Sequence, residues 1–575
     1  MPCGRNCKAK HLFRASGSGL NVNSRLPKEQ VRVRGIKFRN LEDVKRVRAE
    51  LFQQLIPRQD QARSEARPRM TSEIDEIKLE GTAEKAAFLI NGSQYFSQLA
   101  DTLRRAQRRI WIVGWDFNPN ILLEPQSSNQ TLGELLESCA RANPDLQIKI
   151  LIWALGPVYS KKSLSVVSKA NFPQNGGIDL RFAFQPAVRG CHHEKLVCVD
   201  DTAAFIGGID LTSRRWDTYH HKVRDRLRCD PEGVAYDPLH DLQVMVTGEA
   251  AALISKVARQ RWRDATGETY DAVAIKRVPD WLNGSAVTLS DVPVKLAVSK
   301  PTTLFKTGLR QGIRLTMAMI ARAERQLYIE TQYLASFNVS EALAARLQEP
   351  NGPEIVIVCT ATSHGWIENT IMGGNRDRII QRLRRADRNN RLRVFHPVVH
   401  DGCEQAELLV HSKLQIADDK LLRMGSSNLN HRSEGLDTEC DILFEASRHD
   451  HCLAIAHLRD LLVAEYFGCS VDAVKEATHR KGSLIGAIEE LNVNRKTLRA
   501  FVPTGEKYGP VFATSIVDPS CPIGQSARAF CRRVAGRIFL FFRTLRSNLA
   551  RNEDQIHKRT HNKKTDAAKC SLGTD

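Results

Sequence analysis

The sequence lacks any hydrophobic run long enough to act as a signal peptide or membrane anchor. Near the start, His11-Leu12-Phe13 is interrupted by Arg14, and the apolar run 538–542 is far shorter than the roughly 20 residues that span a bilayer. No acidic residue precedes Glu29, so the composition leaves an organellar transit peptide open. We expect a cytoplasmic protein or one held peripherally at a membrane.

Cysteine patterns typical of metal sites or disulfide frameworks are also missing. The chain has 14 cysteines but no Cys-x-x-Cys pair. Cys3 lies near Cys7 and Cys191 lies near Cys198, and the rest are scattered. This distribution favours a reducing compartment.

The middle of the chain has no net charge, although the whole chain carries +19. Residues 1–70 hold 17 Lys+Arg against 6 Asp+Glu, and residues 521–575 hold 12 against 4. Residues 71–520 therefore hold 55 of each sign. The basic character belongs to the two ends, which disfavours a body built to follow a nucleic-acid backbone.

One short pattern is present twice, as His193-Glu194-Lys195 with Asp200 and as His411-Ser412-Lys413 with Asp418. Both copies read His-x-Lys-x-x-x-x-Asp and run into apolar residues. This pattern predicts a strand that presents His and Lys on one face.

The surroundings of the two copies also match. Tyr328 follows Trp111 by 217 positions, and His411 follows His193 by 218. A nearly constant offset indicates an internal duplication, so we predict two homologous halves packed about a pseudo-twofold axis. Two unrelated buried histidines would not keep this register.

Two such strands side by side would gather two imidazoles and two ammonium groups in one pocket, which suits a phosphodiester. The lysines would neutralise phosphoryl oxygens, one neutral imidazole would attack phosphorus, and the other, protonated, would supply a proton to the leaving oxygen. This chemistry requires no metal or other cofactor. A zinc site made from Cys191, His192 and His193 would consume a catalytic histidine. The residues alone do not say which of the two histidines attacks.

These motifs, with Gly207-Gly208-Ile209-Asp210-Leu211, Arg214-Arg215-Trp216-Asp217 and the run 328–333, resemble the phospholipase D superfamily over residues 85–470, and within it the lipid-active enzymes. The resemblance implies that His193 is the nucleophile and that His411 is first the acid and then the base. It also implies hydrolysis of a glycerophospholipid to phosphatidic acid and a free headgroup through a phosphohistidine, with possible transfer to an alcohol.

The predicted site has three groups of residues. Each imidazole needs an orienting carboxylate, and the candidates are Asp217 and Glu439, of which Glu439 is the better match to the family. The candidates for binding phosphoryl oxygens are the backbone at Gly207 and Gly208 and the side chains of Ser426 and Asn428. The predicted catalytic set is His193, Lys195, Asp200, His411, Lys413 and Asp418.

Three further assignments concern aspartates in and near the motifs. Asp200 and Asp418 could equally serve by holding the lysines and the neighbouring turns. Asp210 stands where the second half has Asn428, and we expect it to be structural. His240-Asp241 reads as a local hydrogen-bonded pair without an assigned role.

Helical and strand patterns recur in the same order in both halves, which predicts an α/β fold of two sandwich halves, each a mixed sheet flanked by helices. We expect a basic, mostly disordered extension at 1–70, a first half at 71–275 and a second half at 301–505. A linker at 276–300 is expected from Pro279, Asn283-Gly284-Ser285 and Pro293.

The C-terminal extension, 506–575, carries a predicted basic amphipathic helix. Its apolar positions are Phe530, Val534, Ile538, Phe541, Leu545 and Leu549. Such a helix could lie on an anionic membrane or dock on the body with its arginines in solvent.

We expect a monomer that acts on phospholipid at a membrane surface, because one chain holds both motifs. The alternatives are a nuclease, a cardiolipin-synthase-like phosphatidyltransferase and a membrane scaffold with a dead site. The neutral middle argues against the first, the missing membrane spans against the second, and the intact His-Lys pairs against the third.

Overall fold

The computed structural model describes residues 73–155, 177–184, 190–275, 278–282, 288–303, 307–361, 372–492, 497–503, 514 and 518–519. The predicted extension at 1–70 and the predicted amphipathic helix near the C-terminus lie outside these residues.

The elements of the first half are, in chain order, β1 (Glu80–Ile90), α2 (Asn91–Arg104), β2 (Arg109–Gly114), α3 (Leu132–Ala142), β3 (Gln147–Trp153), β4 (Ile178–Ala183), β5 (Leu196–Val199), β6 (Ala203–Gly207), β7 (Leu239–His240), β8 (Leu242–Thr247) and α6 (Glu249–Thr266). Those of the second half are β9 (Leu289–Lys300), β10 (Leu309–Arg310), α7 (Gln311–Arg322), β11 (Gln326–Thr331), α8 (Phe337–Gln348), β12 (Glu354–Cys359), α10 (Gly374–Ala386), β13 (Leu392–Asp401), β14 (Glu404–Glu407), β15 (Leu409–Val410), β16 (Lys413–Ala417), β17 (Leu421–Gly425), α11 (His431–Gly435), β18 (Glu439–Glu445), α12 (His449–Phe467), α13 (Val471–Lys481), α14 (Leu484–Leu491) and β19 (Leu498–Ala500).

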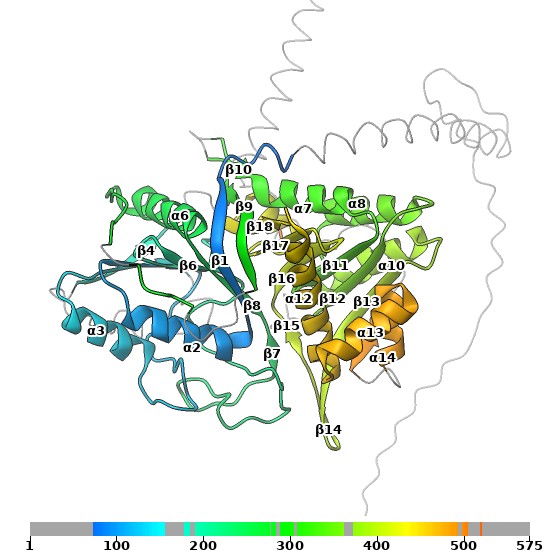
Figure 1. Ribbon diagram of the computed structural model, residues 1–575, viewed down its shortest axis with the longest axis horizontal. Coiled ribbons are helices and arrows are strands. Elements are labelled where there is room, and N and C mark those ends of the chain that lie inside the picture. Colours follow the sequence, from blue (N-terminus) through cyan, green and yellow to red (C-terminus); the bar gives the residue numbers. More distant parts are fainter. Residues whose placement is uncertain are drawn as a thin grey trace, which may run out of the picture. The chain divides into compact units, whose positions relative to one another are not determined.

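The strands of both halves form one hydrogen-bonded succession (Figure 1). Its order is β4-β3-β2-β5-β6-β8-β1 in the first half and β9-β18-β17-β16-β11-β12-β13 in the second. The halves join where β1 and β9 pair antiparallel, from Glu80 opposite Lys295 to Ala86 opposite Leu289. The predicted mixed sheet is therefore confirmed, and it is continuous across the two halves.

The strand register repeats between the halves. Leu196 lies opposite Ile206 in the first half, and Leu414 lies opposite Met424 in the second. Both positions differ by 218, the offset that separates the two motif histidines. The duplication inferred from the sequence thus appears as matching backbone pairing.

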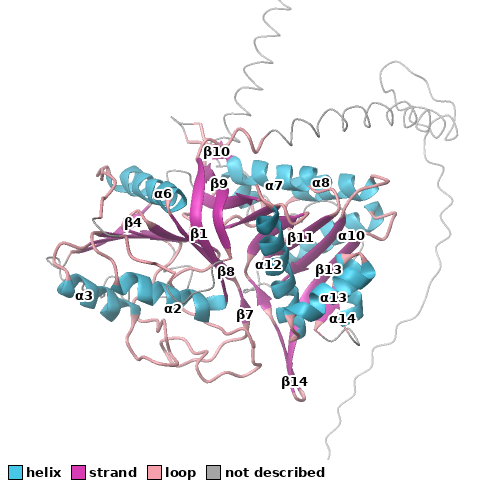
Figure 2. Cartoon of the chain, viewed as in Figure 1, coloured by secondary structure: helices cyan, strands magenta, loops and turns pink. Residues whose placement is uncertain are grey.

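Helices cover both faces of the sheet (Figure 2), and the alternation of side chains along the strands explains why. In β2, Trp111 and Val113 point into a core that also contains residues of α6 and α12, whereas Ile110 and Ile112 point into a second core with α2 and α3. A third core lies between α7, α8, α10 and the strands of the second half. The first of these cores contains residues from both halves, so the two sandwiches share an interior.

The loop expected across 276–300 is wrong for its second part, because residues 289–300 form β9 in the middle of the sheet. Val292, Val294, Leu296 and Val298 alternate into the shared core. Pro293 suggested a break, yet it lies within the β1–β9 pairing opposite Thr82.

Candidate active site

Both motifs sit where a strand of the sheet begins. His193 and Lys195 directly precede β5, and His411 precedes β16, which starts at Lys413. Each lysine ammonium folds back onto the carbonyl oxygen of its motif histidine, at 2.6 Å for Lys195 and His193. The strand start therefore fixes the His–Lys pair before any substrate is bound.

Each motif histidine is held by a carboxylate from the other half. His193 Nδ1 lies 3.0 Å from Glu439 Oε2, and His411 Nδ1 lies 2.7 Å from Asp241 Oδ2. With Nδ1 engaged, Nε2 of each ring remains available for phosphorus or for a proton. The site is thus assembled across the junction between the halves.

Backbone hydrogen bonds accompany these pairs. His193 N donates to the carbonyl oxygen of Thr438 (3.1 Å), and His411 N donates to that of His240 (2.8 Å). Thr438 and His240 directly precede the two orienting carboxylates. The chain positions of Glu439 and Asp241 are therefore tied to the motifs they face.

The two motifs lie close enough for the charges of each to act on the imidazole of the other. Burial lowers the pKa of His193 to about 3, with further contributions from the charges of Lys195 and Lys413. Burial also lowers the pKa of His411 well below its usual value, and Lys413, Arg215, Lys195 and His193 contribute to that shift. Both imidazoles are consequently neutral near pH 7.

The two lysines have different neighbours. Lys195 Nζ lies 3.2 Å from Asp210 Oδ2, whereas Lys413 Nζ lies 3.4 Å from Gln332 Oε1. Burial lowers the pKa of Lys413 to about 7, because the charge of Asp241 only partly offsets the burial and the repulsion from Lys195. The expectation of a structural Asp210 agrees with its contact to Lys195 and to the backbone N–H of Trp115.

The motif aspartates lie at the far end of the motif strands from the histidines. Asp200 accepts hydrogen bonds from the backbone N–H groups of Gln107, Arg108 and Arg109 at the start of β2. Asp418 accepts the equivalent three bonds from residues 324–326 at the start of β11. The structure thus separates both aspartates from the pocket and gives them the turn-holding role.

The expectation that Asp217 orients a motif imidazole is wrong. Asp217 Oδ2 lies 3.0 Å from His221 Nδ1, and its other oxygen accepts from Arg228. The carboxylate beside His411 is Asp241. The register shows that Asp241 is the counterpart of Glu439, since Gly207 faces Gln243 in β6–β8 and Gly425 faces Asp441 in β17–β18.

The reason for missing Asp241 is a longer connection between β6 and β8 than between β17 and β18. Asp241 follows His193, the motif histidine of its own half, by 48 positions, whereas Glu439 follows His411, the motif histidine of its own half, by 28. The signal that could have found it was the His240-Asp241 pair at the start of the apolar strand that follows.

Some of the residues expected to bind phosphoryl oxygens instead contact other groups of the protein. Ser426 Oγ donates to Glu439 Oε2 at 2.5 Å and so holds the orienting carboxylate. At Gly208, the counterpart of Ser426, a Cβ atom would lie 2.2 Å from Asp241 Oδ1, so the glycine makes room for that carboxylate. Gly207 packs against the backbone of Leu242. The buried Asn428 has a side-chain Oδ1 without a hydrogen-bond partner among the described residues.

Arg215 is a further cation at the site that the sequence did not single out. Burial lowers the pKa of His411 and raises that of Asp241; the charge of Arg215 adds to the first shift and partly offsets the second, so its guanidinium lies near this pair. Its Nε is buried without a hydrogen-bond partner among the described residues. The run Arg214-Arg215-Trp216-Asp217 was the available signal.

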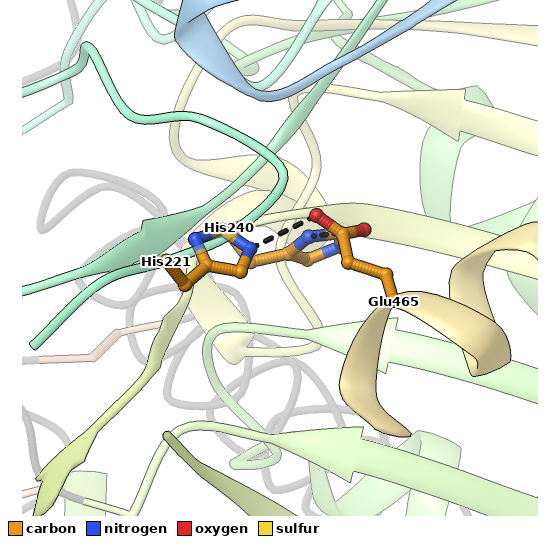
Figure 3. Close-up of side chains that lie close together, drawn as sticks. All are labelled: His221, His240 and Glu465. Atoms are coloured by element: carbon orange, nitrogen blue, oxygen red, sulfur yellow. Dashed lines mark hydrogen bonds and ion pairs between the residues drawn. The ribbon is translucent and has the colours of Figure 1, made fainter. Parts of the chain in front are cut away.

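One group of described residues has the composition of a metal site. His221, His240 and Glu465 place one potential ligand atom each within 4.8 Å of one another (Figure 3). However, His221 lies between Asp217 and Glu465, and His240 lies between Glu330 and Glu465. Such flanking carboxylates favour protonated rings over neutral ligands.

The pKa shifts of these two rings agree with an ion-pair network. Burial disfavours the charged form of each ring, but hydrogen bonds from His221 to Asp217 and Glu465 outweigh it and raise its pKa. The charges of Glu330 and Glu465 likewise raise the pKa of His240 well above its usual value. The group therefore forms a buried chain of alternating charges.

Comparison with known proteins agrees with this geometry. The family model described as "Phospholipase D" matches residues 102–292, and the model described as "Cardiolipin synthase, PLD-like domain" matches residues 316–456. Together they cover both motifs. The chain belongs to the phospholipase D superfamily.

Similar individual members are phospholipases D. Phospholipase D1 of Saccharomyces cerevisiae is 24% identical over 490 residues, which are 68% of this chain and 29% of that protein. Phospholipase D2 of Bos taurus is 24% identical over 468 residues, 63% of this chain and 49% of that protein. This phospholipase D superfamily chain thus spans less than half of either relative.

Among solved structures, phosphatidylserine synthase of Haemophilus influenzae Rd KW20 matches with 14% identity and a TM-score of 0.49, over 68% of this chain and 90% of that one. Within the described residues, no helix has the length and apolar character needed to cross a membrane.

Proposed function

We propose that the protein is a phospholipase D that cleaves the distal phosphodiester of a glycerophospholipid to give phosphatidic acid and a free headgroup. The observation that carries this proposal is the pair of imidazoles, each backed by a carboxylate of the opposite half, beside two lysines. Two oriented imidazoles can divide one phosphoryl transfer into two displacements, each with a nucleophile and a proton carrier.

In the first displacement, Nε2 of His193 attacks phosphorus and the bond from phosphorus to the headgroup oxygen breaks. His411 gives its Nε2 proton to that oxygen. The lysines and Arg215 stabilise the charge on the non-bridging oxygens. Burial and the nearby cations keep His411 neutral in the free protein, and an anionic diester offsets those cations, which helps this ring to carry a proton.

In the second displacement, His411 takes a proton from water while the water oxygen attacks phosphorus. The phosphorus–nitrogen bond to His193 breaks, and phosphatidic acid leaves. Lys195, Lys413 and Asn428 are the groups we assign to the phosphoryl oxygens, with Glu439 and Asp241 orienting the rings. The match to the cardiolipin synthase model favours a second candidate, in which an alcohol replaces water and a phosphatidyl-alcohol forms.

The test is product analysis with phosphatidylcholine vesicles and a short alcohol, using the wild-type chain, His193→Ala and His411→Ala. We expect headgroup release by the wild type and its loss in both variants, with phosphatidyl-alcohol reporting a transferable phosphatidyl group. A parallel reaction contains single- and double-stranded DNA. Histidine-dependent cleavage of DNA without any lipid product would refute the proposal in favour of a nuclease.

A further inference from the structure

The carboxylate of Glu330, on β11, accepts hydrogen bonds from residues next to both members of the Asp241–His411 pair. It is fully buried and accepts hydrogen bonds from Ser412 Oγ (2.7 Å) and His240 Nε2 (2.9 Å). Two tyrosine hydroxyls, of Tyr328 (2.6 Å) and Tyr466 (3.0 Å), donate to its other oxygen. Four donors around one carboxylate fix its position tightly.

Two of those donors are direct neighbours of the groups that we propose for proton transfer. Ser412 separates His411 from Lys413, and His240 precedes Asp241. One carboxylate therefore holds the chain on both sides of the Asp241–His411 hydrogen bond.

The backbone supports the same connection. β7 and β15 pair in parallel, with Leu239 opposite Leu409 and His240 opposite Val410. Asp241 and His411 are the next residues on the two strands, so their side chains meet where this two-stranded ribbon ends. A ribbon of two residues per strand has little stability of its own, and side-chain bonds must hold its register.

The first half holds its histidine differently. There the residue between His193 and Lys195 is Glu194, which is buried, accepts a hydrogen bond from the Thr438 hydroxyl and pairs with Arg261. Thr438 precedes Glu439 as His240 precedes Asp241. The supporting carboxylate in the first half is thus Glu194, which lies within the motif itself. In the second half it is Glu330, which lies on the neighbouring strand β11.

We propose that Glu330 and His240 are positioning residues that align the Asp241–His411 pair for proton transfer. The proposal rests on the function proposed above, in which His411 protonates the leaving group. The proposal assigns different supports to the two histidines. A substitution that weakens the contacts of Glu330 should therefore slow proton donation by His411 and leave attack by His193 largely unchanged.

Leaving-group dependence tests this separation. Choline needs a proton as it leaves, whereas p-nitrophenolate departs as an anion and does not. The substrates are phosphatidylcholine and phosphatidyl-p-nitrophenol, and the measurement is the single-turnover rate of headgroup release. For Glu330→Gln we expect a loss of about 100-fold with phosphatidylcholine, as for a displaced catalytic group, and less than about 5-fold with the nitrophenyl ester.

The matched control is Glu194→Gln, which alters the carboxylate under the nucleophile and should slow both substrates alike. His240→Gln keeps a donor at the Nε2 position and should restore most of the activity that His240→Leu loses. Thermal unfolding of each variant shows whether it is folded, and Ser412→Ala supplies a milder change if Glu330→Gln is not.

Equal losses with both substrates, or no loss in folded Glu330→Gln, would overturn the positioning role. A wild-type protein that releases neither headgroup would instead refute the phospholipase proposal. The two failures are therefore distinguishable.

Discussion

At the scale of single residues, the pocket depends on charges kept close together by burial. Lys195, Lys413 and Arg215 converge on two neutral imidazoles, with the buried Asp241 and Glu439 behind them. Such a collection of cations is costly without a partner and suits an anionic ligand. Two predictions follow from individual members of this group.

Arg215 should bind substrate. Because its charge reaches His411 and its Nε has no hydrogen-bond partner among the described residues, we expect Arg215→Gln to lose a charge-assisted hydrogen bond to a phosphoryl oxygen. Such a bond is worth about 1.5–3 kcal/mol, which corresponds to a drop in kcat/KM of about 10- to 100-fold. Steady-state kinetics on phosphatidylcholine measure it.

The control for Arg215 is its neighbour Arg214, whose side chain is half-exposed and pairs with Asp230. Arg214→Gln should change kcat/KM by less than about 2-fold, as for exposed ion pairs. Equal effects of the two substitutions would contradict a specific role for Arg215.

Deprotonation of Lys413 should lower kcat/KM as the pH rises above about 7. Its pKa is lowered to about 7, mainly by burial, so the free enzyme loses this positive charge as the pH rises through that value. We expect kcat/KM to decrease above pH of about 7, because phosphate binding needs the protonated amine. In Lys413→Arg the guanidinium stays charged, and whatever activity remains should lack this alkaline decrease.

At the scale of elements, the aspartate of each motif holds the strands of the sheet together and does not face the imidazoles. Asp418 accepts three backbone N–H groups at the start of β11, and Asp200 does the same for β2. Both residues have positive φ values, of 54°, and turn the chain between the two strands of a hairpin. The motif thus encodes a turn as well as a catalytic pair.

Asp418→Asn should therefore lower stability more than activity. The amide would turn an NH₂ group toward a backbone N–H, and we expect the free energy of unfolding to fall by about 1–3 kcal/mol. Denaturant unfolding measures this loss, while kcat per folded molecule should stay within about 3-fold. A much lower kcat in a fully folded Asp418→Asn protein would contradict this and show that Asp418 takes part in catalysis.

At the scale of the whole molecule, the two halves are not independent domains. β1 and β9 pair antiparallel at the centre of the sheet, and one core contains side chains of both halves. Phe88 of the first half contacts Phe444 of the second, with ring centroids 5.4 Å apart. Each half also supplies the orienting carboxylate for the other's histidine.

We accordingly expect residues of both halves to unfold in one cooperative transition, seen as coincident curves by fluorescence and circular dichroism. Phe88→Ala should shift the whole transition, with a loss of about 3–5 kcal/mol typical of a buried phenylalanine. Leu453→Ala is the control, since Leu453 is 59% exposed. Two separate transitions, of which Phe88→Ala moved only one, would contradict the shared core.

The sequence alone determined the duplication, the α/β class, the four motif residues His193, Lys195, His411 and Lys413, and Glu439 as an orienting carboxylate. The duplication and the two His–Lys pairs follow from local spacing and repeated register, which one chain displays directly, whereas Glu439 was implied by the resemblance to the phospholipase D superfamily. β9 was missed because a proline and a turn-rich segment before it concealed an alternating strand.

Only the tertiary structure decided which carboxylate faces which histidine, because Asp241 and His411 lie 170 positions apart and meet across a pseudo-twofold junction. It also showed that Asp217 and Ser426 hold other side chains and do not have the roles predicted for them. Arg215, His240 and Glu330 were found close to the Asp241–His411 pair only in the folded chain. Contacts between distant segments depend on how the two halves pair, and the spacing of residues within either half does not specify that pairing.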